Sequence, residues 1–351
     1  LVRPSPPSGA GARSRFSDDA LKTQGAEIAA TAAEALRDAD VLLKVRRPSP
    51  DEVKALKPGA LVIAMLDPYG GKSGLEALAA TGGSLFSMEF MPRITRAQSM
   101  DVLSSQANLA GYKAVVDAAA MFGSAMPMMM TAAGTVPAAK AFIMGAGVAG
   151  LQAIATARRL GAQVTATDVR PAAKEQVASL GAKFVAVEDE EFKQAQTAAG
   201  YAKPMSAEYQ AKQAELVANH IKNQDIVITT ALIPGRPAPR LITRAMVESM
   251  KPGAVIVDLA GERGGNCEAS EPGRTVEVGG VTIYAPLNLA GEIPVNASSL
   301  YAKNLLALLA TLVDKDSQAL KVDWDDEIVK GTLVAKDGKI VHPSLTQGAA
   351  T

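Results

Sequence analysis

Residues 140–168 read KAFIMGAGVAGLQAIATARRLGAQVTATD. The apolar run Ala141–Met144 predicts a short buried strand, and Gly145-x-Gly147-x-x-Gly150 follows it without a break. Residues at helical spacing come next, and a second strand ends the stretch. In this pattern the first glycine permits a tight turn, the second lets the backbone approach a pyrophosphate, and the third lets the helix pack closely on the strand. The stretch therefore predicts a dinucleotide-binding unit with phosphate at a helix N-terminus.

Asp168 ends the second strand, about 20 residues past the glycines, where a carboxylate accepts hydrogen bonds from the adenosine ribose. It should repel a 2′-phosphate, so NAD(H) is favoured over NADP(H). Arg170 argues mildly the other way, because it could meet that phosphate. Glycines of this kind also serve helix–strand packing without any ligand, but the strand, helix and acid around them favour a nucleotide site.

The composition of the 351 residues is that of a globular protein long enough for two domains. Basic and acidic residues number 36 each, so the net charge is zero and no nucleic-acid partner is indicated. Cys267 is the single cysteine, which excludes a disulfide framework and a thiolate metal site, and no metal is expected. No apolar run is long enough to span a membrane, so we expect any membrane association to come through another chain.

The chain before the glycines alternates between strands and helices, which is typical of a parallel α/β sheet. Strands are predicted at Val41–Val45, Ala60–Met65 and Ser84–Met88. Gly70–Ser73 reads GGKS after a strand and resembles part of a phosphate-binding P-loop. The first glycine of that motif would fall at Leu66, which argues against nucleoside triphosphate binding.

The second domain is predicted to be a doubly wound sheet of six main strands, which begin at residues 141, 164, 183, 225, 254 and 281. Between them, Glu188–Met205 reads as a long polar loop with a Gly-Tyr tip. A long helix is predicted at Ala297–Val313, and a hairpin around Asp337-Gly338 ends the chain. The predicted domains are residues 1–100 with 297–351, and residues 101–296.

Residues 91–119, MPRITRAQSMDVLSSQANLAGYKAVVDAA, join the two predicted domains and are unusually polar. They lead into a long helix that should run to about Phe122. A solvated, salt-bridged helix face is the ordinary interpretation of such a charged cluster.

This segment, with PMMMTAAGTVPAAK before the glycines and TTALIPGRPAPRLIT after them, resembles the NAD(H)-binding component (domain I, in the alpha subunit) of proton-translocating NAD(P)+ transhydrogenase. The resemblance covers Arg15 to His342, and RAQSMD is specific to that family. It implies two Rossmann-like α/β domains with a nucleotide cleft between them. It also implies direct, Re/Si-specific hydride exchange between bound NAD(H) and NADP(H) on a partner component, coupled to proton translocation.

The family further implies a homodimer that is cytoplasmic and peripheral on the inner face of the plasma membrane, held there by an NADP(H)-binding component and a transmembrane proton-channel component. It implies roles at the nicotinamide, its ribose and the pyrophosphate for Arg93, Gln98, Asp101 and Ser104, with Gln98 nearest the hydride transfer. Further cofactor-binding positions that the resemblance or the glycine motif implies are Arg96, Tyr112, Gly145, Gly147, Val148, Gly150, Asp168, Val169, Arg170, Gly200, Tyr201 and Leu232. The Glu188–Met205 loop matches the family's mobile loop, which closes over nucleotide.

Two departures and two alternatives accompany the resemblance. The family's first strand and helix should precede Arg15, and LVRPSPPSGA does not resemble them, so the first domain is expected to lack them. Alanine dehydrogenase has a similar fold and carries a catalytic histidine where Met65–Gly71 reads MLDPYGG here. The chain's two histidines, His220 and His342, lie elsewhere, which weakens that alternative. An NAD-binding protein without turnover is the other.

Overall fold

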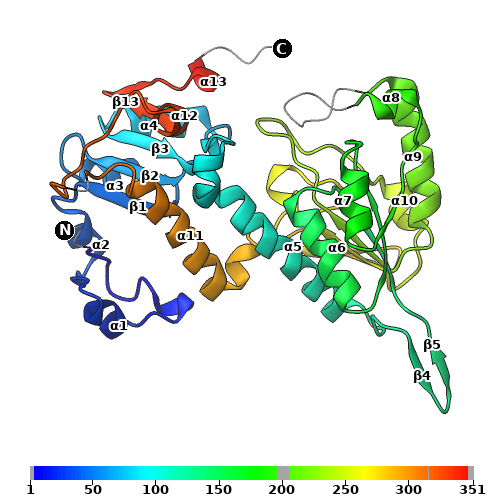
Figure 1. The fold of residues 1–351 in the computed structure, drawn as a ribbon. Coiled ribbons are helices and arrows are strands. Elements are labelled where there is room, and N and C mark those ends of the chain that lie inside the picture. Colours follow the sequence, from blue (N-terminus) through cyan, green and yellow to red (C-terminus); the bar gives the residue numbers. More distant parts are fainter. Residues whose placement is uncertain (1–3, 196–204, 315, 347–351) are drawn as a thin grey trace. The chain divides into compact units, whose positions relative to one another are not determined.

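The structure is a computed structural model that describes residues 4–195, 205–314 and 316–346. The chain divides into two compact units, which we call the first unit (Leu1–Gln106 with Pro294–Thr351) and the second unit (Ala107–Ile293). The sequence placed these boundaries at residues 100 and 296. Figure 1 draws the first unit in blue, cyan, orange and red and the second mainly in green and yellow. Among the described residues, no helix combines the length and hydropathy needed to cross a membrane.

The second unit is built on a seven-stranded sheet in the order β11-β12-β10-β9-β6-β7-β8. Six of these strands are parallel, and only β11 runs antiparallel, at the edge beside β12. The bounds are β6 Lys140–Met144, β7 Gln163–Thr167, β8 Lys183–Phe184, β9 Ile226–Thr229, β10 Val255–Asp258, β11 Thr275–Val278 and β12 Val281–Tyr284. The chain winds from β6 to one side and from β9 to the other, which confirms the predicted doubly wound, Rossmann-like sheet. Its topological switch point lies between β6 and β9, where such sheets bind ligands.

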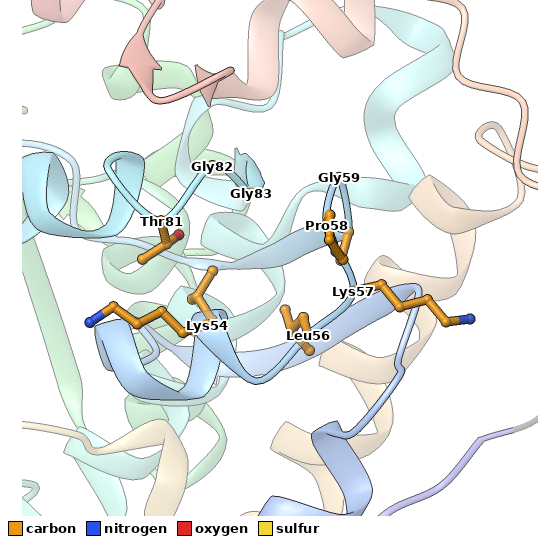
Figure 2. Close-up of a pocket in the computed structure, with 10 residues that line it drawn as sticks. Lys54, Leu56, Lys57, Pro58, Gly59, Thr81, Gly82 and Gly83 are labelled. Carbon is orange, nitrogen blue, oxygen red and sulfur yellow. The ribbon is translucent and has the colours of Figure 1, made fainter.

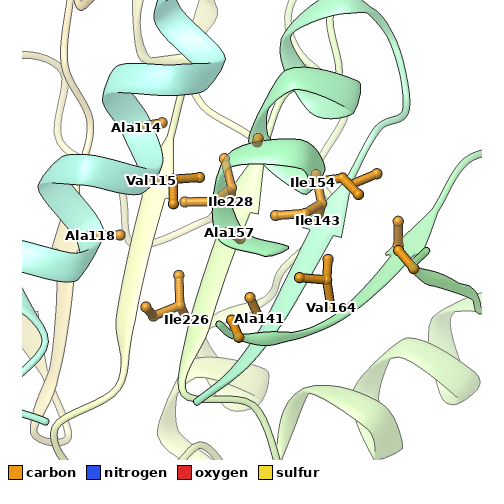
Figure 3. Packing of buried hydrophobic residues seen from close by; sticks show 14 of the residues in the cluster. Ala114, Val115, Ala118, Ala141, Ile143, Ile154, Ala157, Val164, Ile226 and Ile228 are labelled. Atoms are coloured by element: carbon orange, nitrogen blue, oxygen red, sulfur yellow. The ribbon is translucent and has the colours of Figure 1, made fainter. Parts of the chain in front are cut away.

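Helices cover both faces of this sheet, so its strands are apolar throughout rather than alternating with polar residues. Along β6, Ala141 and Ile143 point into one core and Phe142 and Met144 into the other. Figure 3 shows the first of these cores, where α5 and α6 meet β6 and β9. The helices are α5 Val102–Met121, α6 Val148–Arg159, α7 Ala173–Ser179, α8 Glu190–Lys193, α9 Ala207–Ile221 and α10 Arg244–Glu248, with 3₁₀ turns η4 Gly261–Arg263 and η5 Ala290–Glu292.

The first unit carries a five-stranded sheet in the order β1-β2-β3-β13-β14. Its strands are β1 Val41–Arg46, β2 Leu61–Met65, β3 Ser84–Ser87, β13 Leu333–Lys336 and β14 Lys339–Ile340. The first three are parallel, and the C-terminal hairpin continues the sheet antiparallel to β3. The helices are α1 Asp18–Thr23, α2 Ala32–Leu36, α3 Pro50–Lys54, α4 Lys72–Ala79, α11 Pro294–Leu309, α12 Glu327–Thr332 and α13 Pro343–Thr346, with 3₁₀ turns η1 Ala12–Ser14, η2 Met88–Phe90 and η3 Thr95–Met100.

Three elements differ from the sequence prediction. The helix α11 begins at Pro294 rather than at residue 297, because proline is well suited to the first turn of a helix. The helix α8 lies inside the predicted loop, where Asp189 caps it and Phe192 is buried. A hairpin of β4 (Met129–Thr131) and β5 (Gly134–Val136) was not predicted, since its tight turn lacks the Asn-Gly or Asp-Gly pair that marks most hairpins.

Candidate nucleotide-binding site

The three glycines after β6 are required for different reasons. Gly145 has φ 106°, and a Cβ there would lie 2.4 Å from the hydroxyl of Thr230. A Cβ at Gly150 would lie 1.7 Å from the carbonyl oxygen of Gly145, so only glycine lets α6 pack this close to the turn. Gly147 caps α6 with φ −75°, and a Cβ there would meet no atom within 4 Å. The chain itself therefore requires glycine at two of the positions but not at Gly147.

Asp168 lies at the carboxyl end of β7, beside the glycine turn. Its carboxylate accepts hydrogen bonds from the backbone N–H of Ala146 (2.7 Å) and of Arg170 (2.8 Å). The guanidinium of Arg170 donates to both carboxylate oxygens, at 2.9 and 3.0 Å. The hydrogen bond from Asp168, followed by the partial burial of the guanidinium, raises the pKa of Arg170 above its ordinary value. Asp168 thus fixes the glycine turn as well as offering a carboxylate at the strand end.

Two residues that the sequence did not single out hold the other side of the switch point. The hydroxyl of Thr230 donates to the carbonyl of Gly145 at 3.1 Å. The buried amide of Asn266 accepts from Ala231 N at 3.0 Å and donates to the carbonyls of Ala231 and Pro239 at 2.9 and 2.8 Å. These bonds fix the loop after β9 against the glycine turn. A polar residue directly after a buried strand was the available signal for Thr230, while Asn266 gave none because its partners are distant backbone groups.

Exposed apolar side chains follow the carboxyl ends of three neighbouring strands. Val148 follows β6, Val169 follows β7 and Leu232 follows β9, and they are 41, 45 and 53% exposed. Apolar surface grouped around a few polar groups is typical of a ligand site rather than of ordinary protein surface. The structure thus places Gly145, Gly147, Val148, Gly150, Asp168, Val169, Arg170 and Leu232 at one edge of the second unit's sheet.

Tyr112 also belongs to the second unit, on α5, and is 43% exposed. The predicted positions Gly200 and Tyr201 lie outside the described residues.

The RAQSMD segment belongs to the first unit, where it forms η3 and the start of α5. Asp101 caps α5, because its carboxylate accepts from the N–H of Ser104 at 2.9 Å and from its hydroxyl at 2.5 Å. Arg96 forms a bidentate ion pair with Asp326 at 2.7 and 2.8 Å. Asp101, Ser104 and Arg96 therefore each have a structural partner, and a role in nucleotide binding remains a prediction for them.

Gln98 and Arg93 are exposed residues of the same segment. Within the part of the chain that the structure describes, the side-chain amide of Gln98 makes no hydrogen bond. The neighbours Ala97 and Met100 are buried and anchor η3 in the core. Gln98 therefore presents an unpaired amide from a fixed backbone, as a ligand-binding amide requires.

The loop of residues 66–71 follows β2, at the position where alanine dehydrogenase has a catalytic histidine. Arg47 donates to three carbonyls of this loop, at distances from 2.5 to 3.2 Å. The carboxylate of Glu89 accepts from the N–H groups of Leu66 and Asp67 at 3.0 and 2.8 Å. Asp67 has φ 46°, a left-handed conformation that these bonds maintain. The loop is a fixed structure, and it contains no histidine.

Both histidines of the chain are engaged with the protein interior. The ring nitrogen Nε2 of His220 lies 2.9 Å from the hydroxyl of Thr165 on β7. His342 donates through Nε2 to the carbonyl of Gly331 at 3.1 Å, and its Nδ1 accepts from Ser344 N at 3.3 Å. Burial lowers the pKa of each ring. Neither is placed as a general acid or base for a bound substrate.

A pocket of about 240 Å³ lies in the first unit, at the amino ends of β2 and β3. Figure 2 shows Lys54 and Lys57 at its rim, pointing away from each other. Parallel α/β sheets bind ligands at the carboxyl ends of their strands, so we do not assign the nucleotide to this pocket. Its lining consists of Val53, Lys54, Leu56, Lys57, Pro58, Gly59, Ala60, Thr81, Gly82 and Gly83.

Comparison with known proteins identifies the family. Residues 7–110 match the model of the alanine dehydrogenase/PNT N-terminal domain, and residues 114–343 match that of the C-terminal domain. The first of the two polypeptides that form the NAD(P) transhydrogenase alpha subunit of Rhodospirillum rubrum is 56% identical, over 97% of this chain and 90% of the relative. A crystal structure of transhydrogenase from Sinorhizobium meliloti superposes with a TM-score of 0.87 at 60% identity, over 96% of this chain and 90% of that one.

Alanine dehydrogenase is a more distant relative. The enzyme of Mycolicibacterium smegmatis is 30% identical, over 97% of this chain and 86% of the relative. The identity is thus much higher to transhydrogenase than to this dehydrogenase. The chain belongs to the alanine dehydrogenase/PNT family, and within it to the NAD(P) transhydrogenase alpha subunits.

Proposed function

We propose that the chain binds NAD(H) at the carboxyl edge of the second unit's sheet. The pyrophosphate lies over the turn from Gly145 to Gly150, and Asp168 accepts hydrogen bonds from the adenosine ribose. The observation that carries this proposal is the open space at Gly147. Neither packing nor backbone conformation explains glycine there, whereas the close approach of a pyrophosphate does.

We further propose that the bound NAD(H) exchanges a hydride with NADP(H) on a partner component. Oxidation of an alcohol or amine by NAD+ releases a proton as well as a hydride, and such enzymes place an acid–base group beside the substrate. Exchange between two nicotinamides needs no such group. The engagement of both histidines, and the absence of histidine from the MLDPYGG loop, support nicotinamide exchange. The names of the R. rubrum and S. meliloti relatives support it independently.

The partners follow from the same proposal. We expect a homodimer that works with an NADP(H)-binding component and a transmembrane component coupling exchange to proton translocation. The chain would then be cytoplasmic and peripheral, held at the inner face of the plasma membrane by those subunits. In the proposed reaction the segment containing Arg93, Gln98, Asp101 and Ser104 acts on the nicotinamide half of NAD(H), with Tyr112 near the ring.

The test begins with titrations of the purified chain with NADH and NADPH. We expect NADH to bind more tightly, and Asp168→Ala to weaken NADH by about 1 to 3 kcal/mol. Asp225→Ala is the control, because Asp225 holds Lys140 N and Lys251 at the amino edge of the sheet. Equal affinity of the wild type for both nucleotides would contradict the site assignment.

Two activity assays then separate the enzyme classes. Hydride exchange with an added NADP(H)-binding component supports transhydrogenation. NADH consumption with pyruvate and ammonia would instead make the chain an alanine dehydrogenase. NADH binding without either reaction would leave a nucleotide-binding protein without turnover.

A further inference from the structure

The carboxylate of Asp168 is fully used by donors of the chain itself. Its Oδ2 accepts from Ala146 N and from Nη2 of Arg170, at 2.7 and 3.0 Å. Its Oδ1 accepts from the backbone N and from Nε of Arg170, at 2.8 and 2.9 Å. A carboxylate offers about four lone-pair sites, so these bonds saturate it. The side chain is 8% exposed, and a further donor has no lone pair left to meet.

These bonds divide into a fixed pair and a removable pair. The N–H groups of Ala146 and Arg170 belong to the backbone of the glycine turn and of the strand end. The other two donors belong to the guanidinium, whose side chain is 31% exposed and can rotate away. Its release frees one acceptor site on each oxygen of Asp168. The two neighbouring hydroxyls of a ribose match those two sites in number and in spacing.

We propose that Arg170 is a specificity-determining residue that competes with the adenosine ribose for Asp168. The inference rests on the proposed binding of NAD(H) at this edge. The guanidinium holds the ribose positions until the nucleotide displaces it, so the ion pair lowers the affinity for NADH. Once displaced, the guanidinium remains within a side-chain length of the ribose, where it attracts a 2′-phosphate. Arg170 therefore narrows the preference for NADH that Asp168 provides.

The substitution Arg170→Gln tests this competition in the full chain. We expect NADH to bind about three- to tenfold more tightly, as expected when a partly exposed bidentate ion pair no longer has to be broken. NADPH should bind no more tightly than to the wild type, so the ratio of the two dissociation constants increases. Arg170→Lys keeps the charge but loses the planar fork, and should lie between the wild type and the glutamine variant.

Arg274→Gln is the matched control, because it removes an arginine paired with Glu271 elsewhere in the second unit. Both nucleotides should bind to this control as they bind to the wild type. Thermal unfolding without nucleotide shows that each variant is folded. If Arg170→Gln and Arg170→Lys both bind NADH as the wild type does, or more weakly, Arg170 does not compete with the ribose and the inference is wrong. A wild type that does not bind NADH at all overturns the proposed function and the inference with it.

Discussion

At the scale of single residues, the glycine turn offers two substitutions of the same size with opposite expected effects. Gly150→Ala places a methyl group 1.7 Å from the carbonyl oxygen of Gly145, which cannot move without the backbone. We expect it to lower the free energy of unfolding by about 3 kcal/mol or more. Gly147→Ala meets no atom within 4 Å, so stability should change by less than about 1 kcal/mol. NADH binding should nevertheless fall about tenfold or more.

The measurement is urea unfolding and NADH titration of both variants. Unchanged NADH affinity of Gly147→Ala would mean that the pyrophosphate does not approach this residue, and would remove the main support for the nucleotide site.

The sequence predicted the glycine turn better than it predicted the surroundings of Asp168. Glycine spacing carries the turn because it reflects local backbone geometry at Gly145 and Gly150. The sequence also placed Asp168 at the strand end, but it treated Arg170 only as a possible partner for phosphate. A side chain two residues on from a carboxylate can fold back onto it, and only coordinates show whether it does.

At the scale of elements, the C-terminal hairpin has a structural role that its sequence did not reveal. The sequence predicted the hairpin, and the pairing of β13 with β14 confirms it. Its addition to β3 depends on hydrogen bonds between distant parts of the chain, which no local pattern encodes. The opposite failure occurred at β4 and β5, whose turn lacks the usual residues. In α8, a short capped helix was hidden within a polar stretch read as a loop.

The hairpin's role can be tested with two valines. Val334 on β13 is completely buried in the core of the first unit, whereas Val341 just after β14 is 43% exposed. Val334→Ala should lower the stability of the first unit by about 1 to 3 kcal/mol through lost burial and a cavity, and Val341→Ala by less than about 0.5 kcal/mol. Trp324, the single tryptophan of the chain, stacks on Phe86 of β3 and so reports on this unit.

Urea unfolding followed by tryptophan fluorescence is the measurement. Equal midpoints for the two variants would show that the hairpin does not contribute to the stability of the first unit's core.

At the scale of the whole molecule, the proposed reaction requires the nicotinamide of NADH to be held for exchange with a second protein. The two C4 atoms must come within about 3 to 3.5 Å of each other, so a small displacement of either ring slows the reaction strongly. Gln98 is suited to hold the nicotinamide end, because its backbone is fixed on both sides. Ala97 and Met100 are buried, and Asp101 caps the helix that follows.

Gln98→Asn keeps the amide and shortens its reach by one methylene. NADH should still bind within a few-fold of the wild-type affinity, because Asp168 and the glycine turn are unchanged. Hydride exchange with an NADP(H)-binding component should fall by about 10²-fold, as expected for a misplacement of up to 1 Å between reacting groups. Gln163→Asn at the exposed start of β7 is the control and should leave exchange unchanged. Stopped-flow measurement of single-turnover exchange distinguishes the two effects. A Gln98→Asn variant that exchanges hydride at the wild-type rate would show that this amide does not position the nicotinamide.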